Sequence, residues 1–195
     1  MTGDAFGADD HATPLAPEER VGLIPSHVTL KGELNELELA NILEADQWAF
    51  SRRRNVVSEP FLRSLHRRMF RHVWRWSGTY RKSERNLGIE SFRIEPELRQ
   101  LLGDVEYWVE LETYPADEIA VRFHHRLVSI HPFPNGNGRW SRLAADLLIV
   151  QLGGERFSWG RVNLQNPGDT RRAYVEALRA ADGHNIAPLV RFARS

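Results

Sequence analysis

The chain carries, between positions 131 and 142, the sequence His131-Pro132-Phe133-Pro134-Asn135-Gly136-Asn137-Gly138-Arg139-Trp140-Ser141-Arg142. On both sides of it, apolar residues recur at three- and four-residue intervals, which predicts two buried helical faces. Two prolines cannot continue the first helix, so it should end near position 131. The sequence therefore predicts a short loop between two buried helices. The apolar positions are Ile119, Ala120, Phe123, Leu127 and Ile130 before the loop, and Trp140, Leu143, Ala144, Leu147 and Leu148 after it.

The residue types of this loop suit a phosphate-containing ligand. Gly136 and Gly138 allow the backbone to turn tightly and to approach a bound group. The free N–H groups of the following helix, with Arg139 and Arg142 one turn apart, favour phosphate oxygens. His131 is the residue type best suited to accept a proton near neutral pH. The pattern indicates transfer of a phosphorus-centred group. A tight helix-to-helix turn with a structural histidine uses the same residues, and this alternative stays open.

Composition is typical of a single compact domain. The chain has 195 residues, of which 42% are hydrophobic, and can bury one sizeable core. It contains no cysteine, which excludes disulfides and thiolate metal sites. A signal pattern and a long apolar run are both lacking, so we expect a cytoplasmic protein without a membrane segment. Zinc hydrolysis by His124, His125 and His131 is disfavoured, because no carboxylate lies at a zinc-like spacing.

Charge is distributed unevenly although the formal net charge is zero. Residues 1–46 contain ten acidic and two basic residues, whereas residues 52–85 contain eleven basic and two acidic ones. One interpretation is an acidic N-terminal arm that docks over a basic nucleotide cleft. The other is that most of these charges lie on solvated helical faces. Because the whole chain has no basic excess, we do not expect it to bind nucleic acid.

Helical periodicity continues through most of the chain, and we predict an all-α fold. The ranges 1–32 and 33–195 should form a flexible leader, rich in Gly, Ala, Asp and Pro up to position 18, and one helical domain. Helices are predicted on both sides of the loop and at 33–52, 59–76, 95–113, 169–181 and 185–194.

The loop resembles the signature of the Fic/Doc family, His-x-Phe-x-(Asp/Glu)-Gly-Asn-Gly-Arg-x-x-Arg. The matching residues are His131, Phe133, Gly136, Asn137, Gly138, Arg139 and Arg142. Asn135 departs from it, since the family has a carboxylate there. The resemblance extends from Leu65-His66-Arg67 through Trp76 to Arg81, and from Arg171 through Tyr174 to Phe192, and so covers roughly residues 33–194. More narrowly, the chain is similar to the subgroup called mobile mystery protein B.

The resemblance implies a protein adenylyltransferase with a Fic-type helical domain and a small β-hairpin flap. Such an enzyme transfers AMP from ATP to a Ser, Thr or Tyr hydroxyl of a target protein. By this resemblance His131 is the catalytic base, and Tyr174 is part of the adenine pocket. The flap falls at Leu87, Gly88, Ile89 and Glu90, whose backbone would align the target by strand addition. The phosphates would be bound by Gly136, Asn137, Gly138, Arg139 and Arg142.

The resemblance also implies Mg²⁺ as the metal ion that accompanies ATP. Asn135 stands at the position of the metal-binding carboxylate. A neutral amide oxygen can bind Mg²⁺, but it brings no charge to a cation that prefers carboxylates and phosphates. The sequence therefore predicts altered or weakened dependence on magnesium.

The segment Thr29-Leu30-Lys31-Gly32-Glu33-Leu34-Asn35 resembles the family's inhibitory motif, (Ser/Thr)-x-x-x-Glu-(Gly/Asn), at Thr29 and Glu33. If the motif applies, Glu33 pairs with Arg139 and occupies the space of the terminal phosphate of ATP. The alternative is an ordinary glutamate of a first helical turn.

A second functional class also stays open. It is a Fic-fold module that has lost turnover and binds a nucleotide or a partner. That partner would be a small helix-turn-helix protein, as in a toxin–antitoxin pair.

Overall fold

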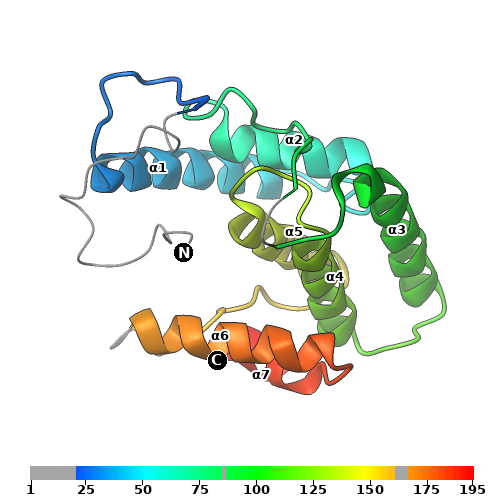
Figure 1. Ribbon diagram of the computed structural model, residues 1–195. Coiled ribbons are helices and arrows are strands. Elements are labelled where there is room, and N and C mark those ends of the chain that lie inside the picture. Colours follow the sequence, from blue (N-terminus) through cyan, green and yellow to red (C-terminus); the bar gives the residue numbers. More distant parts are fainter. Residues whose placement is uncertain (1–20, 85–86, 161–166) are drawn as a thin grey trace.

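The computed structural model describes residues 21–84, 87–160 and 167–195 (Figure 1). Regular structure in these ranges is helical, apart from isolated bridge positions, which include the antiparallel bridge between Leu23 and Trp74. The all-α prediction is confirmed for this part of the chain. The elements are α1 (Lys31–Phe50), α2 (Glu59–Phe70), the 3₁₀ turn η2 (Ser91–Arg93), α3 (Ile94–Glu110), α4 (Ala116–Ile130), α5 (Asn137–Gln151), α6 (Pro167–Asp182) and α7 (Ala187–Arg194).

Helices α4 and α5 form the centre of the fold, with the signature loop between them (Figure 1). The pair α1 and α2 packs on one side, where α2 contacts α5, and the pair α6 and α7 packs on the other side against α4. Helix α3 lies along α4. The loop therefore lies where three helical layers meet, so that each layer can contribute a side chain to it.

The apolar stripes predicted around the loop are buried as expected. Phe123, Leu127 and Ile130 of α4 and Trp140 and Ala144 of α5 are all inaccessible to solvent or nearly so. Burial of side chains of this size stabilises a fold by about 1.5–3 kcal/mol each. The core therefore stabilises the two helices that carry the loop.

Helix α1 buries polar residues on its inner face. Glu38 and Asn41 are both buried, next to the small residues Ala45 and Ala49. The carboxamide of Asn41 donates to the carbonyl of Leu37 and accepts from the backbone N–H of His72. Polar and apolar residues therefore share the inner face of α1, which weakens its apolar periodicity. The polar ones face polar partners, Arg139 for Glu38 and the backbone of His72 for Asn41.

Helix α2 ends six residues earlier than the predicted range 59–76. It closes at Phe70, and the chain then turns. The backbone of these turns bonds outside the helix: Ile24 N–H donates to Val73 O at 2.8 Å, and Arg75 N–H donates to Gly22 O at 2.9 Å. The predicted extension was wrong because Val73 and Trp76 pack on the core from turns rather than from a helix.

The leader predicted for residues 1–32 lies mostly outside the described residues. Its described part, from residue 21 onward, is irregular until α1 begins at Lys31. Leu23 and Val28 are buried in the core, so this part is attached to the domain.

The flap predicted at Leu87–Glu90 contains bends, and η2 follows it from Ser91. Its described residues form no paired strands, and residues 85–86 lie outside the description. The β-hairpin part of the fold prediction is therefore not seen in this segment.

None of the helices in the described ranges is both long and apolar enough to cross a membrane.

Candidate active site

His131 caps the C-terminal end of α4 in a left-handed backbone conformation, with φ of 52°. This region is sparsely populated for residues other than glycine and costs about 1–2 kcal/mol. The backbone N–H of His131 donates to Leu127 O at 3.2 Å, and its carbonyl accepts from Arg81 Nε at 2.7 Å. The structure thus fixes the backbone of the proposed base on both sides. The side chain is half-buried.

Arg81 connects the signature loop to the flap segment. It is only 3% exposed, and its backbone N–H donates to Pro132 O at 2.9 Å. Its guanidinium also donates to the carbonyls of Ser83, Ile89 and Ile130. A guanidinium offers five donors in a fixed fork, which a lysine cannot reproduce. One buried side chain therefore sets the position of the flap relative to His131.

Gly88 brings the flap into direct contact with His131. A Cβ atom at Gly88 would lie 2.5 Å from Cβ of His131, and the residue has φ of 97°. Any side chain here would displace the histidine or the flap, and would also strain the backbone. The predicted flap residue Gly88 is thus located beside the proposed base.

The signature loop is closed by Asn137. Its carboxamide donates to Phe133 O at 2.8 Å and accepts from Phe133 N–H at 2.9 Å. Asn137 and Phe133 are both buried. The side chain predicted to bind phosphate therefore shapes the loop in this structure, and phosphate binding by Asn137 stays a prediction.

His66 of α2 packs against the signature loop and is hydrogen-bonded to it. Its Nδ1 accepts from Gly78 N–H at 2.9 Å, so Nε2 carries the proton that it donates to Asn135 O at 3.1 Å. The ring stacks on Phe133 with centroids 3.7 Å apart. Burial lowers the pKa of His66 to about 3, and the nearby Arg139 acts in the same direction. His66 is therefore neutral near pH 7, and its hydrogen bonds link α2 to the signature loop.

The first turn of α5 presents backbone donors in the loop. Gly136 precedes the helix with φ of 78° and packs on the ring of Phe70. The helical hydrogen bonds begin with Trp140 N–H, which donates to Gly136 O at 3.0 Å. The N–H groups of residues 137–139 precede that bond and lie at the positive end of the helix dipole. This arrangement suits an anion.

Arg139 forms an ion pair with Glu38 of α1. Its Nη1 lies 2.6 Å from Oε2 of Glu38, whose side chain is only 2% exposed. The other oxygen of Glu38, Oε1, accepts from Trp74 Nε1 at 2.6 Å. Glu38 therefore occupies a buried position between Trp74 and the arginine of the signature loop.

This geometry corrects the predicted partner of Arg139. The inhibitory motif, if it applied, placed Glu33 there, but the Glu33 carboxylate accepts from the backbone N–H groups of Thr29 and Leu30 at the start of α1. Glu33 is exposed, whereas Glu38 lies more than one turn further along the helix, on the inner face. The geometry of Glu33 is that of the alternative, an ordinary glutamate in the first turn of a helix.

The remaining predicted ligands lie between α5 and α6. Arg142 donates from Nε to Gly138 O at 3.2 Å, and its guanidinium lies 5.5 Å from the ring centre of Tyr174. The Tyr174 hydroxyl is hydrogen-bonded to Nε2 of His124 at 3.1 Å. Burial raises the pKa of Tyr174 to about 12 and lowers that of His124 to about 3, so both are neutral near pH 7. Tyr174 also lies close to Gly138, at 3.9 Å from its Cβ position.

The residues of the loop do not make a carboxylate site for Mg²⁺. The Asn135 side chain is exposed, and its Oδ1 accepts from Gly136 N–H at 2.7 Å. Among the described residues, no three His, Cys, Asp or Glu side chains gather as metal ligands. The neutral amide is also already bonded within the loop. The site therefore lacks the charge that Mg²⁺ prefers in proteins.

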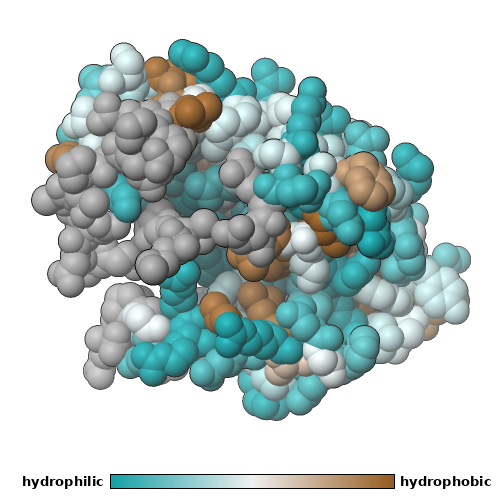
Figure 2. Space-filling view, viewed as in Figure 1, coloured by the Kyte–Doolittle hydropathy of each residue, from teal (hydrophilic) through white to brown (hydrophobic). Residues whose placement is uncertain are grey.

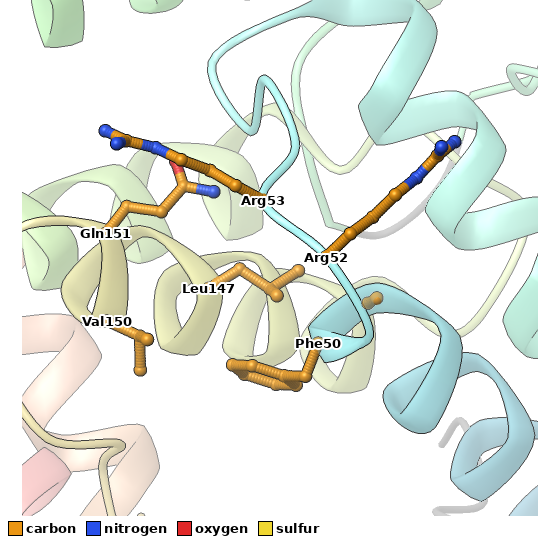
Figure 3. Close-up of a pocket in the computed structure, with 7 residues that line it drawn as sticks. Phe50, Arg52, Arg53, Leu147, Val150 and Gln151 are labelled. Carbon is orange, nitrogen blue, oxygen red and sulfur yellow. The ribbon is translucent and has the colours of Figure 1, made fainter.

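A separate hollow lies at the opposite end of α5. It encloses about 290 Å³ between the end of α1 and the second half of α5 (Figure 3). Arg52 and Arg53 extend away from each other around an apolar floor that includes Phe50 and Leu147 (Figure 3). No signature residue lines it. The lining residues are Ala49, Phe50, Arg52, Arg53, Leu147, Val150 and Gln151.

Several residues of the site were missed by sequence reasoning. Glu38 and Trp74 were not singled out for it, and His66 and Arg81 were quoted only within the resemblance. The signal that could have indicated Glu38 is its position in the sequence, at helical spacing between the apolar residues Leu34 and Ala45. Nothing in the local sequence around Arg81 indicates its contacts with the carbonyls of Ile130, His131 and Pro132, because these residues lie about fifty positions away.

The fold and the loop define a class of protein: a helical domain whose central helix pair presents a histidine and a helix N-terminus suited to an anion. A sequence model described as the Fic/DOC family matches residues 56–149. The chain therefore carries a domain of the Fic/DOC family. Membership of the mobile mystery protein B subgroup stays a prediction.

Similar proteins include insect adenylyltransferases. The chain is 32% identical over 133 residues to "Protein adenylyltransferase Fic" of Drosophila grimshawi, and this covers 66% of the chain and 26% of that protein. It is 31% identical over 132 residues to the protein of the same name of Aedes aegypti, covering 66% and 25%. The chain thus spans about a quarter of the length of these curated relatives.

Solved structures share the fold. BepC of Bartonella tribocorum, solved with bound AMPPNP, is similar with a TM-score of 0.65 and 19% identity, covering 90% of this chain and 95% of that one. Fic-1 of C. elegans is similar with a TM-score of 0.66 and 21% identity, covering 91% and 52%. At these identities the likeness concerns the fold.

Proposed function

We propose that this protein is a protein adenylyltransferase that transfers AMP from ATP to a hydroxyl side chain of a target protein. The observation that carries the proposal is the position of His131 and the α5 N-terminus at the two ends of one loop, which His66, Arg81 and Asn137 hold in shape. The names of the curated relatives support the same reaction.

In the proposed reaction, the imidazole of His131 accepts the proton of the target hydroxyl. The hydroxyl oxygen forms a bond to the α-phosphorus of ATP, and the bond between that phosphorus and the bridging oxygen to the β-phosphate breaks. Pyrophosphate leaves with the bond electrons, and AMP remains on the target. General base catalysis of this kind contributes about 10²–10⁴-fold.

The first turn of α5 would stabilise the negative charge that develops on the α-phosphate. Backbone donors that are already oriented need no reorganisation when the charge forms. Gly138 leaves room for this approach, with Arg142 and Tyr174 beside it, whereas Gly136 packs against Phe70. Adenine binding near Tyr174 is part of this proposal.

Arg139 would bind the terminal phosphates once Glu38 releases it. In the present structure the guanidinium is neutralised by a buried carboxylate. A phosphate group and Glu38 would compete for the same donors. We therefore assign to Glu38 the inhibitory role that the sequence resemblance had given to Glu33.

No step of the proposed reaction relies on a metal ion bound by Asn135. The geometry of Asn135 does not fit a carboxylate-type Mg²⁺ site, as described above. Magnesium that arrives with ATP would be held by the phosphates. Its effect on the rate of labelling is tested separately, by titration of Mg²⁺.

Labelling with two forms of ATP tests the proposal. The purified chain, with and without the substitution Glu38→Gln, is incubated with ATP labelled at the α-phosphate or at the γ-phosphate. AMP transfer attaches only the α-label, to the chain itself or to a protein in an added extract. The substitution His131→Ala should abolish the label, whereas His27→Ala, at an exposed position remote in sequence, should not.

A second candidate is a binding module that has lost turnover. It is favoured by Asn135 in place of the carboxylate and by the occupied guanidinium of Arg139. A small helix-turn-helix partner, as in a toxin–antitoxin pair, belongs to this candidate. Nucleotide binding without any transfer of α-label, even in the Glu38→Gln variant, would favour it.

A further inference from the structure

The hollow at the far end of α5 combines an apolar floor with positive charge. Phe50 and Leu147 form part of the floor, and Val150, which also lines it, is 40% exposed. Arg52 and Arg53 are exposed and extend away from each other around this floor (Figure 3). None of the described residues that line the hollow carries a carboxylate. A ligand that matches this surface is therefore both apolar and anionic.

Exposed apolar groups alone do not identify a site on this protein. Figure 2 shows one face of the molecule, on which apolar groups lie in small patches within a mainly hydrophilic surface. Scattered apolar side chains of this kind are ordinary on protein surfaces. The hollow is distinguished by the two guanidinium groups on either side of its floor.

Arg52 and Arg53 form no ion pair with a carboxylate in the parts of the chain that the structure describes. Asp46, the acidic residue of α1 nearest to them in sequence, is already paired with Arg156 at 2.6 Å. A guanidinium binds a carboxylate through two parallel hydrogen bonds. Both arginines can therefore receive a carboxylate from another molecule.

Two further arginines lie at the same end of α1. The guanidinium groups of Arg54 and Arg68 lie 3.8 Å and 4.0 Å from the ring centre of Trp48. Desolvation lowers the pKa of Arg54, and the positive charges of Arg52 and Arg68 act in the same direction. Positive charge thus gathers beside the hollow, and this field attracts an anionic ligand.

The shape of the hollow restricts the ligand further. Its volume of about 290 Å³ is near the lower end of the range for small-molecule pockets, about 300–1,000 Å³. Because the two arginines diverge, a small ligand with one carboxylate reaches only one of them (Figure 3). A peptide segment with acidic residues on both sides of one apolar side chain reaches both arginines and also covers the floor.

We propose that the hollow is a docking site for a segment of a partner protein in which one apolar side chain lies between acidic residues. A nucleic-acid strand would contact the arginines but leave the apolar floor uncovered, so a protein segment matches more of the surface. No signature residue lines the hollow. The inference is therefore independent of the proposed function, and neither one depends on the other.

Synthetic peptides test this inference with the full chain. The probe is a fluorescent nine-residue peptide with Phe at its centre, two Asp on each side and Ser elsewhere. Fluorescence anisotropy measures its dissociation constant. Replacement of the central Phe by Ser should weaken binding by about tenfold, because the floor then stays uncovered. A peptide with Lys in place of each Asp should not bind.

Charge reversal in the hollow should exchange these preferences. Arg52→Glu combined with Arg53→Glu should weaken binding of the acidic peptide by about tenfold and allow the Lys peptide to bind. The matched control is Arg67→Glu combined with Arg99→Glu, two exposed arginines outside the hollow with the same change in net charge. This control should keep the preferences of the unsubstituted chain.

A photoreactive peptide locates the contact. Benzoylphenylalanine in place of the central Phe should form crosslinks to residues 49–53 or 147–151 of the chain, as mapped by mass spectrometry. Crosslinks confined to other residues would overturn the inference, as would equal binding by both double variants. Absence of binding up to about 1 mM peptide would also overturn it. Binding of decanoate in the hollow without binding of the peptide would replace the partner segment by a small amphipathic anion.

Discussion

The carboxylate of Glu38 lies 2.6 Å from the guanidinium of Arg139, across 101 positions of sequence. Trp74 donates its indole N–H to the same carboxylate, so the position of Glu38 is fixed from two sides. Since Arg139 is an arginine of the loop proposed to bind phosphate, this contact couples helix α1 to the proposed chemistry.

Substitution of Glu38 should activate the protein. Glu38→Gln keeps an oxygen for the indole of Trp74 but removes the charge that neutralises Arg139. We expect self-labelling by α-labelled ATP to rise by about tenfold or more, since about 1.4 kcal/mol of weaker competition corresponds to a factor of ten. Gel-based labelling over time, with the dissociation constant for ATP from calorimetry, measures the effect.

The matched control for this experiment is Glu33→Gln. Glu33 contacts only its own helix start among its described hydrogen bonds, so labelling should stay at the level of the unsubstituted chain. A rise with Glu33→Gln and none with Glu38→Gln would show that the sequence motif, rather than the observed ion pair, identifies the inhibitory residue.

Substitution of Gly88 should impair transfer without unfolding the protein. Gly88→Ala places a methyl group 2.5 Å from Cβ of His131 at a positive φ. We expect the rate of labelling to fall by about 10²-fold, because a displacement near 1 Å is enough for such a loss. The melting temperature should fall by about a few degrees, because the strain of a positive φ costs about 1–2 kcal/mol and the protein stays folded.

Gly103→Ala is the control for the flap substitution. A Cβ at Gly103 meets nothing within 4 Å, and alanine stabilises the interior of α3 by about 1 kcal/mol. Labelling should be unchanged and the melting temperature should rise. Equal loss of labelling in both variants would mean that Gly88 has no special relation to His131.

A carboxylate at position 135 should increase the response to magnesium. Asn135→Asp supplies the negative charge that Mg²⁺ prefers. We expect labelling at saturating Mg²⁺ to rise several-fold and the Mg²⁺ concentration at half-maximal labelling to fall. Titration of Mg²⁺ at fixed ATP measures both quantities. If neither changes, the amide at this position serves the loop rather than the metal.

Stability should fall in mild acid because two histidines are buried in the neutral form. Burial lowers the pKa of His66 and of His124 from 6.5 to about 3. Between these values the unfolded chain binds more protons than the folded one, so the stabilising contribution is complete above about pH 6.5 and is lost as the pH decreases toward 3. Between pH 7 and pH 5, each histidine should lower the free energy of unfolding by about 2 kcal/mol.

Urea unfolding at pH 7 and pH 5, followed by tryptophan fluorescence, measures this loss. His124→Phe removes one buried titrating group, so the decrease between the two pH values should be about 2 kcal/mol smaller, whatever the change in absolute stability. The exposed His27 provides the control substitution, His27→Phe. An unchanged decrease in the His124 variant would show that the ring is solvated in the folded protein.

Local sequence determined the two helices around the signature loop, since the apolar periodicity at Phe123, Leu127, Trp140 and Ala144 requires only that each helix bury one face. It also predicted an anion site at the loop, since glycines, arginines and a free helix N-terminus favour phosphate oxygens, while the same residues left a purely structural turn open. The partner of Arg139, in contrast, was decided by the tertiary structure. Glu33 and Glu38 are the same residue type on the same helix, and only the packing of α1 on α2 places Glu38 inward at the arginine. The end of α2 was decided in the same way. The backbone groups of the turns after α2 bond to Gly22 and Ile24, and such pairings between distant segments leave no periodic signal in either one.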